Sequence, residues 1–94
     1  MVRPPVLTSD ELSGCLGRIP GWTIVDGALH RTFVFADFAD AFAFMTRVAV
    51  VAEELDHHPD WSNSWNRVEI HIRSHDAGGI TETCVSLAER IDAL

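Results

Sequence analysis

Histidines are concentrated in one part of the sequence, since four of the five lie between positions 57 and 75. The unperturbed imidazole titrates closest to neutral pH, so histidine is the usual proton carrier of acid–base catalysis. His57 and His58 are adjacent, and Pro59 makes the following turn rigid, while His75 follows a strand-like segment. This spacing indicates a site that moves protons, with the alternative that these are ordinary surface histidines.

An acidic side chain precedes the histidine pair. Glu53 lies four residues before His57, on the same face of a predicted helix, where it can orient or charge the imidazole. His57 also comes at the end of that helix, where the helix dipole favours a positive charge. His71 alternates with apolar residues, which predicts that it faces the open side of a sheet as a bystander or a lining residue. We expect His30 to be structural or solvent-facing.

Metal binding and nucleophilic catalysis are the rival chemistries. Zinc takes three or four His or Cys ligands, and the HHP run matches neither the H-x₃₋₅-H nor the HExxH spacing. Neighbouring side chains diverge, so we expect no metal. A nucleophilic cysteine needs an adjacent base, and nothing in the sequence places one beside Cys15 or Cys84; Cys84 falls on an apolar helical stripe.

Two tryptophans flank a short polar stretch after the histidine pair. Trp61 and Trp65 enclose the sequence Ser-Asn-Ser. Tryptophans at such spacing usually belong to a core or an interface. The alternative is that one of them stacks on a flat aromatic ligand.

The segments that must position these residues alternate between helical and strand patterns. Thr8 and Glu11 have the spacing of a capping box, and Asp26-Gly27 is a two-residue hairpin signal. Pro59 disfavours helix at the preceding residue, so the long helix should end by 56 or 57. The predicted elements are helix 8–17, strands 22–25 and 28–35, helix 37–56, strands 61–65 and 67–74, and helix 81–93.

This order, α-β-β-α-β-β-α, predicts an α+β fold with a single four-stranded antiparallel sheet and three helices on one face. The clearest half-buried strand is the one in which Val68, Ile70 and Ile72 alternate with polar residues. The long helix is apolar over most of its circumference, so we expect it to pack on the sheet or partly in a subunit interface. The length of 94 residues predicts one domain, 1–94.

Charge and composition narrow the function classes. The formal net charge is −7, which argues against a broad basic face for nucleic acid. The sequence contains no run of about 18 apolar residues, so we expect no membrane span. Residues 1–7 lack the apolar run of a signal peptide. Two cysteines without a dense framework favour a reduced, cytoplasmic protein.

The region around the histidines resembles a known signature. Residues 53–61 read EELDHHPDW, an aromatic residue follows at Trp65, and His75 comes ten residues later within SHDAGGITE. These motifs resemble those of the pterin-4a-carbinolamine dehydratases. The segments 37–38 and 41–45 are similar to the family's long helix, and the likeness extends over nearly the whole chain.

The resemblance implies dehydration of 4a-hydroxytetrahydropterin to the quinonoid dihydropterin, which recycles the cofactor of aromatic amino-acid hydroxylases. It implies that His57 and His75 are the acid–base pair and that His58 contacts the pterin. Glu53 and Asp56 would hold the histidine turn in place and belong to the substrate-binding residues.

Trp61 and Trp65 are further candidates for substrate binding. The pterin is the substrate, so no separate cofactor is expected. The resemblance also implies a homodimer or homotetramer. From the charge and the lack of a long apolar run, we expect no direct nucleic-acid or membrane partner.

One position departs from the family pattern. The family usually has an aspartate nine residues after the later histidine, where this chain has Cys84. If that aspartate orients a catalytic histidine, activity is weakened; if it only caps the last helix, Thr81 and Glu82 compensate. The alternative function is therefore a non-catalytic assembly or protein-binding module, since family members also serve as dimerisation cofactors of a homeodomain transcription factor in animals.

Overall fold

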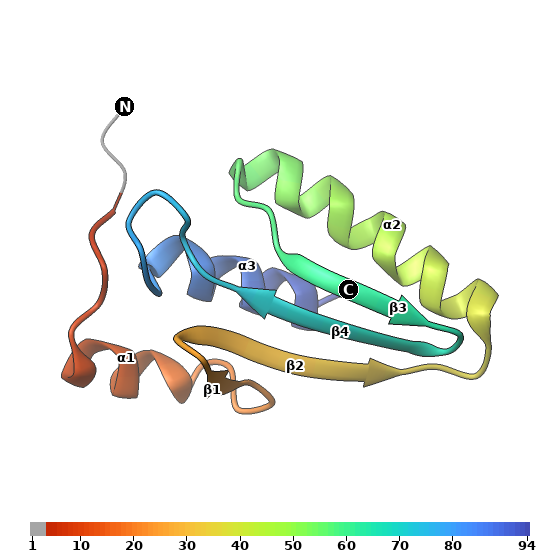
Figure 1. The fold of residues 1–94 in the computed structure, drawn as a ribbon, viewed down its shortest axis with the longest axis horizontal. Helices are drawn as coiled ribbons and strands as arrows, with labels where there is room; N and C mark the ends of the chain where they lie inside the picture. The colour runs from red at the N-terminus through yellow and green to blue at the C-terminus, as the bar shows by residue number, and fades with distance from the viewer. Residues whose placement is uncertain (1–3) are drawn as a thin grey trace.

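Within the part of the chain that the structure describes, seven elements form in the predicted order. A computed structural model describes residues 4–94 (Figure 1). The elements are α1 (Ser9–Leu16), β1 (Thr23–Val25), β2 (Ala28–Val34), α2 (Phe38–Leu55), β3 (Asp60–Ser64), β4 (Arg67–Ile72) and α3 (Glu82–Asp92). The α-β-β-α-β-β-α order is thereby confirmed, with boundaries that differ by no more than two residues.

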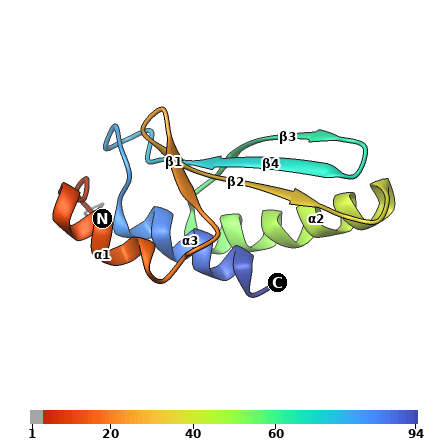
Figure 2. The ribbon, with the colours of Figure 1, turned by 90° about the horizontal axis from the view of Figure 1, so that it is seen from below.

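The four strands form one antiparallel sheet in the order β1-β2-β4-β3. β2 and β4, the two central strands, pair from Leu29 opposite Ile72 to Val34 opposite Arg67. The helices lie on one side of this sheet (Figure 2), as the sequence predicts. Among residues 4–94, no helix covers the opposite face of the sheet.

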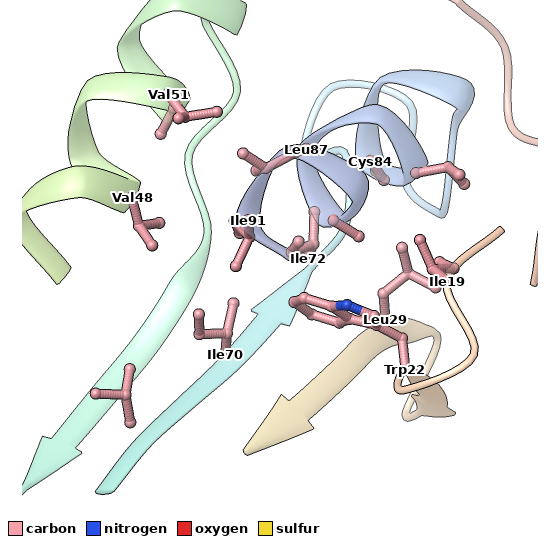
Figure 3. Packing of buried hydrophobic residues seen from close by; sticks show 14 of the residues in the cluster. Ile19, Trp22, Leu29, Val48, Val51, Ile70, Ile72, Cys84, Leu87 and Ile91 are labelled. Atoms are coloured by element: carbon pink, nitrogen blue, oxygen red, sulfur yellow. The ribbon is translucent and has the colours of Figure 1, made fainter. Parts of the chain in front are cut away.

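The core lies between the sheet and the helices α2 and α3 (Figure 3). It takes alternate residues from the strands, which is why Val68, Ile70 and Ile72 are fully buried while their neighbours are not. Leu87 and Ile91 of α3 are fully buried against them. The rest of the buried apolar cluster is Ile19, Trp22, Leu29, Ala41, Phe44, Val48, Val51, Ala52, Ile80, Cys84, Val85 and Ala88.

Arg31 interrupts the apolar face of β2, and the structure shows how it is accommodated. Its guanidinium lies over the ring of Phe33, 4.6 Å from the ring centre, and its Nη1 donates to Asp92 at 2.9 Å. Trp22 Nε1 donates to the same carboxylate at 2.9 Å. Asp92 thus satisfies two donors from the edge of the core, at the end of α3.

The ends of α2 determine where the histidines lie. The Asp37 side chain accepts from the backbone N–H of Asp40 and caps the start of the helix. At the other end Asp56 adopts a left-handed conformation with φ 49°, a geometry that aspartate tolerates better than most residues. The chain therefore leaves the helix sharply just before His57. Within residues 4–94, no helix is long and apolar enough to cross a membrane.

Candidate active site

A cleft of about 180 Å³ opens beside the end of α2. Its walls come from four separate segments: the chain before α1, the turn after α2, the segment after β4 and the start of α3. The lining residues are Pro4, Asp56, His57, His58, Arg73, Ser74, His75, Asp76, Thr81 and Thr83. The three histidines proposed from the sequence therefore meet at one cleft, together with Asp56.

His57 is the buried histidine of the cleft. Its backbone N–H donates to Ala52 O at 3.0 Å, which ties it to the last turn of α2. Its side chain is mostly covered, with 8% of the residue exposed. The ring Nε2 lies 3.2 Å from Cys84 Sγ. The sequence offers no base near Cys84, yet the fold brings the imidazole to it across 27 positions.

Cys84 occupies the third position of α3 and is fully buried. The backbone N–H of Thr81 donates to its sulfur at 3.4 Å, and Thr81 Oγ1 lies 3.5 Å from the same atom. In a capping box this position usually carries a carboxylate that accepts from the backbone N–H of the N-cap residue. Here the Cys84 sulfur is the acceptor. Cys84 therefore contacts both the start of α3 and His57, and the two roles suggested for this position coincide in one side chain.

His58 projects to the exposed side of the cleft. Its Nε2 lies 2.6 Å from Glu53 Oε2, and both side chains are more than half exposed. The sequence paired Glu53 with His57, whereas the structure pairs it with His58. The left-handed turn at Asp56 is the physical reason, because it breaks the helical spacing on which the prediction depended.

His75 has a carboxylate partner that sequence reasoning missed. Its Nε2 lies 2.9 Å from Asp60 Oδ2. Asp60 is the first residue of β3. The histidine itself follows Ser74, whose backbone N–H and carbonyl pair with Gly79 and Gly78 to close a short loop. Only its place directly after HHP in the motif could have pointed to Asp60.

Arg73 adds a cation to the cleft that the sequence did not single out. Its Nε is buried and has no hydrogen-bond partner among the described residues. A buried donor without a partner costs free energy. An acceptor on a bound ligand would remove that cost, which makes Arg73 a binding candidate.

The remaining predicted site residues lie elsewhere. Trp61 is half-buried and packs against the core. Trp65 is 65% exposed at the turn between β3 and β4, and Glu53 reaches the site only through His58. Neither tryptophan lines the described cleft, and their contact with a substrate stays a prediction.

Comparison with known proteins identifies the family of this chain. The family model described as pterin 4 alpha carbinolamine dehydratase matches residues 5–94. A protein of Rhizorhabdus wittichii, provisionally named a pterin-4-alpha-carbinolamine dehydratase, is 53% identical over 90 residues, covering 94% of this chain and 93% of its own. A protein of Solibacter usitatus with the same provisional name is 48% identical over 88 residues, covering 94% and 93%.

A crystal structure shares the fold closely. It is described as a transcriptional coactivator/pterin dehydratase from Brucella melitensis, and it superposes with a TM-score of 0.89 at 41% identity, covering 94% of this chain and 96% of that one. The chain thus shares the α+β fold of that protein. The chain belongs to the pterin-4-alpha-carbinolamine dehydratase family.

Proposed function

We propose that this chain dehydrates 4a-hydroxytetrahydropterin to the quinonoid dihydropterin by histidine acid–base catalysis. The observation that carries the proposal is the meeting of His57, His58 and His75 at one cleft. The reaction expels hydroxide from carbon 4a as water and removes a proton from a ring nitrogen. It therefore needs one group that donates a proton to the leaving hydroxyl and one that accepts the proton from the ring nitrogen. The step involves no oxidation or reduction.

His57 and His75 are the proposed acid–base pair. Each ring is held by a partner: Cys84 for His57 and Asp60 for His75. Fixing a ring in this way keeps its proton-carrying nitrogen aimed at one place. General acid–base catalysis contributes about 10²–10⁴-fold to a rate, which a small site without a further cofactor can provide.

The other residues of the cleft would bind the pterin. His58 lies at the exposed side, where Glu53 holds it. Arg73 would donate its buried, unpartnered Nε–H to an oxygen of the substrate. After reduction to the tetrahydropterin by a separate reductant, the product would again serve aromatic amino-acid hydroxylases, and the protein would act in the cytoplasm.

The test is the initial rate of dehydration of a synthetic 4a-hydroxytetrahydropterin, followed by ultraviolet absorbance. We expect His57→Ala and His75→Ala each to lower kcat by at least about tenfold. Arg73→Lys keeps the charge but removes the Nε–H, and should raise KM about tenfold with a smaller change in kcat. Asp26→Asn, at the exposed β1–β2 turn, is the control and should match the parent chain.

Folding of each variant is checked by far-ultraviolet circular dichroism and thermal melting. Normal rates in folded His57→Ala and His75→Ala would remove the basis of the proposal. A parent chain without any turnover would favour the second candidate function, assembly with another protein. That candidate has its own support in the exposed rings of Phe38 and Phe42 on α2.

A further inference from the structure

The face of the sheet that carries no helix holds two histidines side by side. His30 on β2 and His71 on β4 are directly opposite one another in the strand register. Their ring centres are 4.6 Å apart and the rings are tilted by 45°. Both side chains are half-buried, so the packing of the sheet restricts their motion.

Glu69 completes the group from the same strand as His71. Two residues along a strand return to the same face, so its carboxylate projects beside the two imidazoles. Glu69 Oε2 lies 3.6 Å from His30 Nε2. One ligand atom of each of the three residues lies within 4.8 Å of the others.

We propose that His30, Glu69 and His71 form a binding site for a divalent transition-metal cation such as Zn²⁺. Zinc bonds of about 2.0–2.2 Å place tetrahedral ligand atoms about 3.3–3.6 Å apart. The His30–Glu69 separation of 3.6 Å already has that value. The ligand atom of His71 lies within 4.8 Å of both and would have to move closer on binding. Two imidazoles, one carboxylate and an open fourth position form a known donor set of zinc sites.

The surrounding charges permit a cation. Arg67 contacts this group, with its Nη2 at 3.4 Å from Glu69 Oε2. That contact is long and exposed, and a carboxylate has further lone pairs for a metal. Asp60 of β3 is paired with His71 in the strand register, and it adds a negative charge to the same face of the sheet. Imidazole ligands favour zinc, copper and nickel over magnesium or calcium.

Sequence motifs could not reveal this site. Motif searches look for ligands at short spacings, whereas His30 and His71 are 41 positions apart and are joined by strand pairing. The site is separate from the cleft, since none of its three residues lines it. The inference therefore does not depend on the dehydratase proposal.

Isothermal titration of tag-free, chelator-treated protein with Zn²⁺ tests the site, with visible absorption of Co²⁺ as a report on tetrahedral geometry. We expect one Zn²⁺ per chain and a rise in melting temperature. His30→Ala, His71→Ala and Glu69→Gln should each weaken binding at least about tenfold. His58→Ala and His75→Ala remove cleft histidines as matched controls, and both should bind Zn²⁺ as the parent chain does.

Two results would overturn the inference. The first is the absence of stoichiometric binding at millimolar Zn²⁺ in folded protein. The second is binding that survives His30→Ala and His71→Ala but is lost in His58→Ala or His75→Ala, because the metal would then lie in the cleft. Dehydratase activity plays no part in this test, so either proposal can fail without the other.

Discussion

A buried sulfur in place of a carboxylate changes the physics of the position without removing its contacts. Cys84 accepts from the Thr81 backbone N–H and lies 3.2 Å from His57 Nε2. A carboxylate there would be an ionised group in a fully buried place, which is tolerated only when paired. A thiol avoids that cost, yet it is a weaker hydrogen-bond acceptor. We therefore propose that Cys84 positions His57, and that it holds the ring less firmly than an aspartate would.

Substitution of Cys84 tests this reasoning. Cys84→Ala leaves His57 without its sulfur partner and should lower kcat about tenfold, with KM nearly unchanged. Cys84→Asp should restore or exceed the parent rate, because a charged acceptor orients the ring more strongly. The measurement is the pair kcat and KM for each variant, with melting temperatures to confirm folding. Parent-like kcat in Cys84→Ala would show that the contact has no part in the reaction.

Local sequence determined which site residues could be predicted. His57, His58 and Asp56 are adjacent on one turn, and His75 was found through its motif; all four line the cleft. Asp60, Arg73 and the pairing of Cys84 with His57 were missed, because each depends on how the sheet and α3 close on the turn. The motif predicts that Trp65 contacts the substrate; its side chain is exposed where the chain reverses with φ 50°, and the contact stays a prediction.

At the scale of elements, short-range signals placed the helix and strand ends well. The Thr8–Glu11 capping box forms with both hydrogen bonds, at 3.2 and 2.9 Å. The predicted strand 67–74 ends earlier, at Ile72, because Ser74 instead pairs with Gly79 across the loop. That pairing is local to the folded loop and leaves no periodic pattern in the sequence.

The capping box of α1 also gives a pH dependence of stability. Hydrogen bonds from the Thr8 backbone N–H, and then from its side chain, hold the pKa of Glu11 below its ordinary value of 4.5. A carboxyl whose pKa is lowered in the folded state stabilises that state above its unfolded pKa. This stabilisation is lost as the pH falls through the folded pKa.

Glu11→Gln keeps the size of the side chain but removes the titrating charge. We expect the parent chain to be more stable than Glu11→Gln at pH 7, and the difference to vanish as the pH falls well below 4.5. Urea unfolding of both proteins across this range measures the difference, and the other carboxyls cancel between them. A difference that is constant with pH would mean that the charge of Glu11 does not act on α1.

At the scale of the whole molecule, periodicity predicted the layers but not what meets the outer side of α2. The helix buries Ala41, Phe44 and Val48 against the sheet, as its 3.6-residue pattern requires. The helix also carries apolar residues on its other side. From the sequence alone, such residues could belong either to a wider core face or to a subunit contact. Only the folded chain separates Phe44, which is buried, from Phe42, which is 55% exposed.

The exposed rings of α2 lead to a prediction about assembly. Phe38 and Phe42 lie one turn apart with ring centres 5.7 Å apart and are 49% and 55% exposed. Exposed apolar patches commonly mark protein contacts, so we propose that the chain forms a dimer or tetramer through α2.

Phe42→Asp places a charge in that contact and should shift the mass measured by light scattering toward the monomer. Leu94→Asp, a change of similar exposure at the end of the chain, serves as the matched control. An unchanged mass for folded Phe42→Asp would move the contact away from α2, and a monomeric parent chain would end the proposal.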